Sequence, residues 1–91
     1  MDNPLQSQYF LDAFDDVLAS DQPDIDKLAW AFGRVTEDII ATARQEIEVA
    51  TALHDTEAKI KVQIKMETIK HARHIFATHY QRITGRSVWN E

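Results

Sequence analysis

The chain has 91 residues, of which 44% are hydrophobic and 27% are charged, and its formal net charge is −5. This composition is typical of a globular domain and excludes a disordered chain. The absence of cysteine excludes disulfides, thiolate metal sites and a cysteine nucleophile, and it favours a reducing cytoplasmic setting. The length predicts one domain over residues 1–91, small enough for oligomerisation to be a natural way of enlarging its core.

The first predicted element is a short helix over about residues 4–20. Asn3 suits the N-cap, Pro4 suits the first helical position, and Gln6 stands where a capping box needs it. The apolar face of this helix comprises Phe10, Phe14, Val17 and Leu18. Residues 21–24 predict a turn into the next helix, because Asp and Pro favour helix starts.

The second predicted element is a long helix over about residues 23–53. One apolar stripe runs along it and comprises Ile25, Leu28, Phe32, Val35, Ile39, Ala43, Ala50 and Leu53. Gly33 costs this helix about 1 kcal/mol relative to Ala, and we expect another helix to approach closely there. Trp30 lies off the stripe, so we expect it to pack against the first helix or a second subunit.

The third predicted helix spans about residues 56–84 and carries two apolar stripes. The first stripe comprises Val62, Met66, Ile69, Ala72, Phe76, Tyr80 and Ile83. The second stripe comprises Ile60, Ile64, His71 and Ile75, and it lies roughly 150° around the helix axis from the first. A helix with two apolar faces needs neighbours on both. We therefore expect the helices at 23–53 and 56–84 to form an antiparallel hairpin that dimerises into a helical bundle through the second stripe.

Two segments of this pair allow an alternative. Residues 53–57 lack Gly and Pro, so the two helices could fuse into one rod of about 60 residues, roughly 90 Å long. Residues 58–66 alternate between apolar and polar side chains as a strand does, and such a strand would have to pair with its own copy. We expect a turn at the first segment, because His54 and Asp55 suit a helix end and an N-cap. We expect a helix at the second, because Lys, Gln, Met and Ala are good helix formers.

The third helix is predicted to end before Gly85, since glycine is favoured just after a helix, where the backbone turns left-handed. Arg82 in the last turn is favourable to the helix dipole. A short tail over residues 85–91 follows. We expect Val88 and Trp89 to pack against the helices, because a fully exposed Trp is unusual.

Charge is divided unevenly along the chain. Residues 1–58 hold thirteen acidic and three basic side chains, whereas residues 59–91 hold seven Lys or Arg and two Glu. A basic helix packed beside acidic helices of the same molecule explains this division. We also expect an acidic face to steer a protein partner with a basic surface. That face comprises Asp12, Asp15, Asp16, Asp24, Asp26, Glu37 and Asp38.

The candidates for a metal site are Glu67, His71 and His74, which share an arc of roughly 60° on the third helix. Carboxylate-bridged diiron bundles use Glu-x-x-His pairs, whereas the spacing here is Glu-x-x-x-His. His71 also lies in the second stripe, where a hydrogen-bonded interface histidine is the commoner outcome. We therefore predict no metal or cofactor and keep a metal-binding helical bundle as the first alternative.

Binding of nucleic acid through the third helix is the second alternative. It requires a contiguous basic surface. The basic residues do not form one: Lys59, Lys70 and Arg73 cluster, Lys61 and Lys65 lie nearly opposite, and Arg82 lies elsewhere. A nucleic-acid partner is therefore disfavoured.

The sequence as a whole predicts an all-α fold and a small, acidic, cytoplasmic module for protein–protein interaction, acting as a regulator, adaptor or inhibitor. No Gly-rich phosphate loop or serine-centred elbow is present, so we expect no enzymatic activity. No apolar run reaches 18 residues, and the first residues lack the pattern of a signal peptide. We therefore expect neither a membrane span nor export.

Overall fold

The structure is a computed structural model that describes residues 14–89. Helices account for 83% of these residues, and no strand occurs among them. The helical segments are a short one at 14–18, α2 at Asp24–Ala52 and α3 at Thr56–Thr84. The predicted all-α fold class is confirmed. The expected capping residues Asn3, Pro4 and Gln6 lie outside the described residues, as does Phe10.

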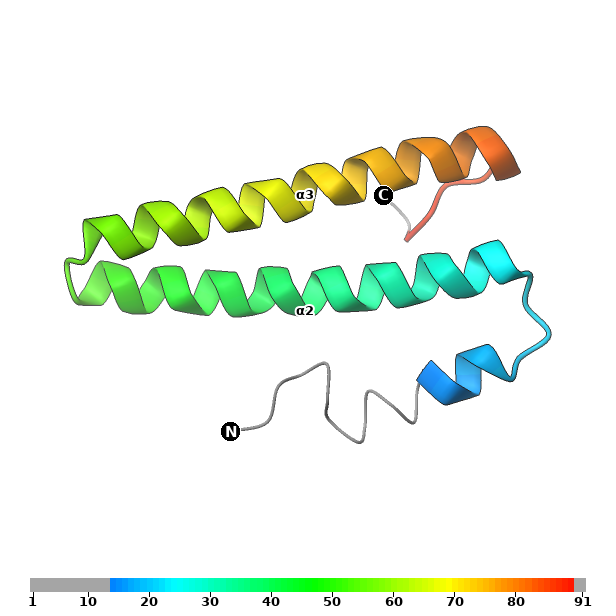
Figure 1. Cartoon of the computed structure of the whole chain (residues 1–91), viewed down its shortest axis with the longest axis horizontal. Helices are drawn as coiled ribbons and strands as arrows, with labels where there is room; N and C mark the ends of the chain where they lie inside the picture. Colours follow the sequence, from blue (N-terminus) through cyan, green and yellow to red (C-terminus); the bar gives the residue numbers. More distant parts are fainter. Residues whose placement is uncertain (1–13, 90–91) are drawn as a thin grey trace.

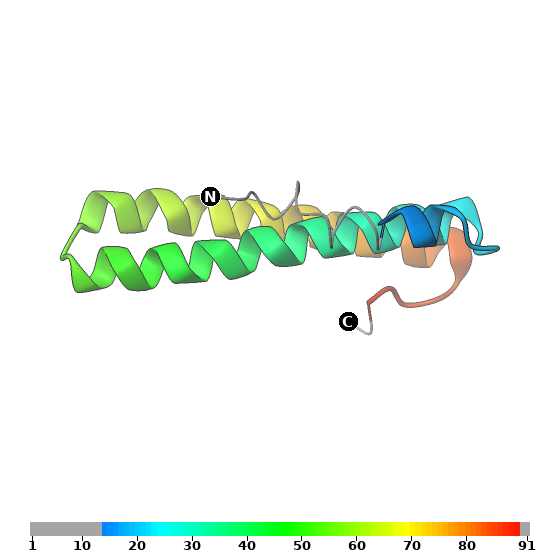
Figure 2. The ribbon, with the colours of Figure 1, turned by 90° about the horizontal axis from the view of Figure 1, so that it is seen from below.

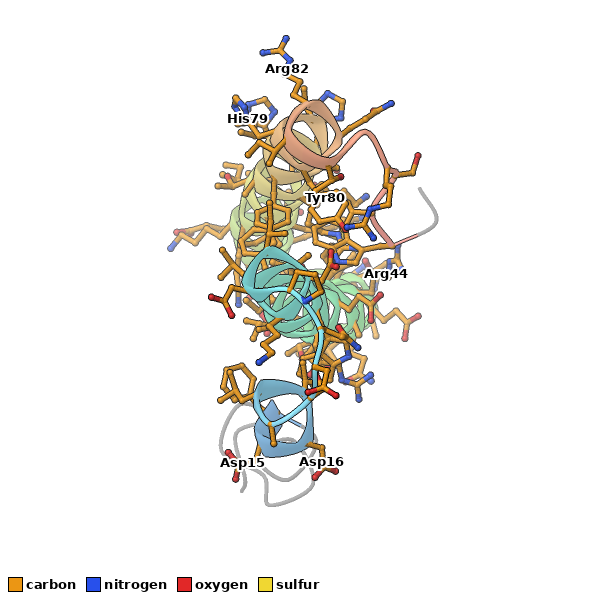
Figure 3. The ribbon with its side chains drawn as sticks, turned by 90° about the vertical axis from the view of Figure 1, so that its right-hand side faces the viewer. Asp15, Asp16, Arg44, His79, Tyr80 and Arg82 are labelled. Atoms are coloured by element: carbon orange, nitrogen blue, oxygen red, sulfur yellow. The ribbon has the colours of Figure 1, made fainter. Side chains whose placement is uncertain are left out.

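The three helical segments are stacked in a row. α2 and α3 run side by side in opposite directions, and the segment at 14–18 lies on the side of α2 opposite α3 (Figures 1 and 3). The ring centroids of Phe14 and Trp30 lie 6.2 Å apart, so Trp30 packs against the first helical segment, as predicted. The molecule is long and thin, with extents of 48 × 31 × 15 Å (Figure 2).

A turn built without glycine separates α2 from α3. His54 has a positive φ of 55°, and its N–H donates to the Thr51 carbonyl at 3.2 Å. The N–H of Asp55 donates to the Ala50 carbonyl at 2.9 Å, and this pair of bonds is the Schellman pattern of a helix end. The Asp55 side chain then caps α3 by accepting from the Ala58 N–H at 3.1 Å. Two separate helices, rather than one continuous rod, therefore flank residues 53–55.

Residues 58–66 belong to α3, so the strand alternative for this segment is wrong. A helix advances about 100° per residue, which places alternate residues on roughly opposite sides. The strand-like pattern therefore comes from a helix that is apolar on two sides. α3 ends as predicted: Gly85 has a φ of 73°, and its N–H donates to the Gln81 carbonyl at 2.8 Å.

α2 presents small residues to α3. The buried residues of α2 are Ala29, Gly33, Thr36, Ala43 and Ala50. These small side chains leave room beside α2 for α3 and, at Gly33, for the tail. Larger residues at the margins of the predicted stripes remain exposed, among them Leu28, Leu53 and Ile83. A single neighbouring helix covers only a narrow arc of its partner, and for this reason these three side chains stay in contact with solvent.

The core lies at the end of the helix pair where the tail returns. It comprises Ala29, Tyr80 and Val88, with Ile25, Phe76, Ala77 and Trp89 packed against it. Figure 2 shows the tail folding back along one side of the two helices. Val88 and Trp89 thus pack against the helices, as predicted. None of the helices in the described part is long and apolar enough to cross a membrane.

Candidate functional site

The second stripe of α3 is an exposed apolar face. Ile60, Ile64 and Ile75 are 50%, 62% and 45% exposed, and His71 is exposed as well. The side chain of Arg82, which the helix repeat places at the same angle as this stripe, points away from α2, whereas Tyr80 points toward it (Figure 3). The second stripe therefore faces away from α2. No helix of the described chain covers it.

Polar side chains border the second stripe. Glu57 and Lys61 form an ion pair of 3.1 Å, and Glu67 and Lys70 form one of 3.5 Å. Between these pairs the surface of α3 forms a shallow concavity, lined by Ile60, Gln63, Ile64, Glu67, Thr68 and His71. An apolar centre within a charged rim is the arrangement found in protein–protein interfaces.

The predicted acidic residues do not form a single face. Asp15 and Asp16 are exposed and lie on the first helical segment, at the far side from α3 (Figure 3). Asp24 is exposed at the start of α2. Glu37 is also exposed, but it lines a hollow between α2 and α3, and Asp38 is half-buried. Asp12 lies outside the described residues.

Asp26 is occupied by an internal cluster and is not part of an open acidic face. The Arg86 Nη2 donates to the two carboxylate oxygens of Asp26 at 3.1 and 3.2 Å. The Tyr80 hydroxyl also donates to this carboxylate, and the Arg86 guanidinium lies 5.7 Å from the centroid of the Tyr80 ring. Asp26 therefore links the start of α2 to the tail instead of serving as a free charge for a partner.

These contacts shift the pKa of each member of the cluster. The hydrogen bond from Tyr80 lowers the pKa of Asp26, and Arg86 lowers it further, although desolvation opposes both. The same hydrogen bond raises the pKa of Tyr80, with desolvation acting in the same direction. The Asp26 carboxylate raises the pKa of Arg86. The cluster is most favourable when Asp26 is ionised and Tyr80 is protonated.

Gly33 makes room for the indole of Trp89 rather than for another helix, which corrects the sequence-based expectation. A Cβ at Gly33 would lie 2.8 Å from Cε2 of Trp89, closer than carbon atoms can approach. The indole Nε1 donates to the Ala29 carbonyl at 2.8 Å. The Trp89 ring stacks on Phe76 and Phe32, with centroid distances of 5.4 and 6.0 Å.

Arg73 is a buried charge that holds the same site together. Its Nη1 donates to the Gly33 carbonyl at 2.9 Å and to the Thr36 hydroxyl. Its guanidinium lies 4.3 Å from the centroid of the Trp89 ring, within the range of a cation–π interaction. Sequence reasoning placed Arg73 in a surface basic cluster and missed this role. Its position between Ile69 and Phe76, within the arc of the first stripe, was the available signal.

The remaining basic residues of α3 are dispersed. Lys65 pairs with Glu46 of α2 at 3.9 Å, whereas Lys61 and Lys70 pair within α3. Arg82 and His79 point outward at the far end of the helix (Figure 3). A hollow of about 490 Å³ between α2 and α3 gathers Arg44, Lys70, Arg73 and His74 beside Glu37. Arg73 is buried within this group, whereas Arg44, Lys70 and His74 are exposed, and the adjacent Glu37 partly neutralises their charge.

The metal candidates Glu67, His71 and His74 are all exposed on α3. Within residues 14–89, no group of three or more His, Asp or Glu side chains is placed to hold a metal ion. The structure therefore does not bring these three side chains together into a ligand set.

No protein-family model, curated protein or solved structure matches the chain. The class of the protein is therefore described from its fold and its exposed surfaces alone. It is a small all-α protein with an exposed apolar face along α3. At one end it has a core that the tail residues Val88 and Trp89 complete (the tail-locked core).

Proposed function

We propose that the protein is a non-catalytic protein–protein interaction module of the cytoplasm that self-associates into a helical bundle through the second stripe of α3. The observation that carries this proposal is the alignment of Ile60, Ile64 and Ile75 on one exposed face. Isolated exposed apolar residues are ordinary, but an aligned set within a polar rim is typical of an interaction site. We assign no cofactor and no metal to this activity.

The energetics favour a reversible complex. Full burial of an isoleucine contributes about 1.5–3 kcal/mol, and these three side chains are each about half exposed. Six half-buried isoleucines from two copies therefore contribute roughly 5–9 kcal/mol in total. Association costs about 4–15 kcal/mol in lost freedom. Because the two quantities are comparable, burial of the isoleucines alone leaves little net free energy, whereas a micromolar dissociation constant needs about −8 kcal/mol. The self-association near micromolar concentration that we expect therefore requires further contacts from the polar rim.

A second surface is proposed for a different protein partner. Asp15, Asp16 and Asp24 are exposed near one end of the molecule. Their charges would accelerate the approach of a protein with a basic surface, since electrostatic complementarity acts mainly on the association rate. In this proposal the second stripe joins copies of the chain, and the acidic end recruits the partner as a regulator, adaptor or inhibitor would.

Sedimentation equilibrium at micromolar concentrations tests the proposal. We expect the chain to sediment with more than its monomer mass of 10.5 kDa, and Ile64→Asp to weaken self-association at least tenfold without loss of helical circular dichroism. Ile83→Asp is the matched control, because Ile83 is 71% exposed on the same helix but lies outside the second stripe. A monomer mass across the whole concentration range, or equal effects of the two variants, contradicts the proposal.

A further inference from the structure

The spacing of the second stripe is the same from either end, although the order of its residue types is not. Its four positions are separated by four, seven and four residues, so their midpoint falls between Glu67 and Thr68. A face with this symmetry is complementary to itself when a second copy is turned end for end. An interface around a two-fold axis has this property, because residue i contacts residue j and residue j contacts residue i.

We propose that two copies of the chain pair antiparallel along α3, around a two-fold axis that passes between Glu67 and Thr68. This inference rests on the proposed self-association through the second stripe and specifies its geometry. Ile60 then lies opposite the partner's Ile75, and Ile64 lies opposite the partner's His71. Every member of the stripe is thus matched. The contacts between Ile60 and Ile75 lie toward the two ends of the interface, and those between Ile64 and His71 lie nearer the axis.

The charges of α3 favour the antiparallel direction over the parallel one. Glu57 lies in the first turn of α3 and Arg82 in the last. Antiparallel pairing brings Glu57 of each helix toward Arg82 of the other, whereas parallel pairing would place Glu57 beside Glu57 and Arg82 beside Arg82. It also sets the two helix dipoles in opposite directions. Near the axis, Glu67 comes within reach of the partner's Lys70, which occupies the same flank.

This geometry makes the assembly bivalent. Thr84 lies 16.5 residues from the midpoint at Glu67 and Thr68, and a helix rises 1.5 Å per residue. The two copies of Thr84 are therefore about 50 Å apart. The exposed acidic residues at the first helical segment and the start of α2 lie at the same end of the molecule as Thr84, although the first helical segment is on the other side of α2 (Figure 1). The dimer thus presents two acidic ends at opposite poles, suited to a protein that carries two basic sites or to two copies of a basic protein.

Disulfide trapping tests the arrangement, and the natural chain has no cysteine to interfere. The variants Ile60→Cys and Ile75→Cys are oxidised separately and as an equal mixture, and covalent dimers are quantified by non-reducing electrophoresis. We expect the mixture to give at least tenfold more covalent dimer than either variant alone, since residues 60 and 75 face each other only across the axis. Ile83→Cys, exposed but off the stripe, is the control for random collisions.

The outcomes separate this inference from the function on which it rests. Efficient trapping by Ile60→Cys alone would show parallel pairing and overturn the inference while leaving self-association intact. Stronger trapping by a mixture of Ile64→Cys and Ile75→Cys would place the axis elsewhere, and it would also overturn the inference. A natural chain that sediments as a monomer contradicts both proposals together.

Discussion

The two ends of the α2–α3 pair differ in how far their apolar side chains are covered. Where the tail returns, Trp89 fills the groove between the helices, and the buried side chains of Tyr80 and Arg73 lie beside it. At the turn, Val49, Leu53 and Ile60 remain 58%, 71% and 50% exposed. Two helices alone cannot cover their own apolar surfaces, so a third layer is needed. The tail supplies that layer at one end, and we propose that a second copy supplies it along the outer face of α3.

This comparison assigns stability to the tail end and binding to the second stripe. Removing a contact at the tail end should unfold the chain more readily without changing how copies associate. Removing a contact on the second stripe should weaken self-association without making the single chain unfold more readily.

The largest expected effect is that of Trp89→Ala. The substitution removes the indole between the helices, and truncations of this kind cost about 3–5 kcal/mol when the side chain is fully buried. Since Trp89 is half-buried, we expect a loss of about 2–3 kcal/mol and a fall in Tm of more than about 10 °C. Thermal unfolding at fixed protein concentration measures it. Ile83→Ala should change stability by less than about 0.5 kcal/mol, and equal losses in the two variants would contradict a tail-locked core.

The effect of Gly33→Ala on stability should change sign when the Trp89 side chain is removed. In the natural chain the added methyl group collides with the Trp89 ring, so we expect destabilisation of about 1–2 kcal/mol, as in other overpacked sites. In a Trp89→Ala background the collision disappears, and the higher helix propensity of alanine should stabilise the chain by about 1 kcal/mol. Urea unfolding of the four proteins in this cycle measures the coupling. Additive effects would mean that Trp89 does not occupy the space above Gly33 in solution.

His54→Gly should stabilise the turn between α2 and α3. His54 has a φ of 55°, a conformation that costs a non-glycine residue about 1–2 kcal/mol. Glycine removes this cost but loses more chain entropy on folding, so the expected net gain is about 0.5–1 kcal/mol. A Tm increase of a few degrees would be the sign. Thr51→Gly, one turn earlier within α2, should instead be destabilising.

The smallest expected effect is the pH dependence of the Asp26 cluster. The pKa of Asp26 is lowered in the folded state, so the stabilisation is complete above its unfolded value of about 3.9 and is lost as the pH falls through the folded value. The pKa of Tyr80 is raised, so its contribution is present below about pH 10 and is lost as the pH rises beyond that value.

Urea titrations between pH 7 and pH 2 test the acidic limb of this prediction. Asp26→Asn should reduce the loss of stability in acid relative to the natural chain. Asp24→Asn, exposed two residues earlier, is the matched control and should leave the acid dependence unchanged. An identical pH profile in all three proteins would mean that the Arg86–Asp26–Tyr80 contacts do not persist in solution.

The sequence alone determined the helical elements and their ends. α3 spans Thr56–Thr84, the range that its N-cap and the following Gly85 predict, and α2 differs by one residue at each end from its expected range. Both depend on local rules, since periodicity and capping involve residues at most four positions apart. The two-sided nature of α3 was also visible in the sequence, because its stripes follow from helical geometry alone.

Only the tertiary structure decided which residues these helices bury and which they leave exposed. Trp89 meets Ala29 across 60 positions, Arg73 meets Gly33 across 40, and Tyr80 meets Asp26 across 54. Sequence reasoning therefore assigned Gly33 to a neighbouring helix, Arg73 to a basic surface and Asp26 to an acidic face. The residue types at these positions are compatible with either role. The choice between the roles depends on where the tail returns along the helices, and no local pattern encodes that path.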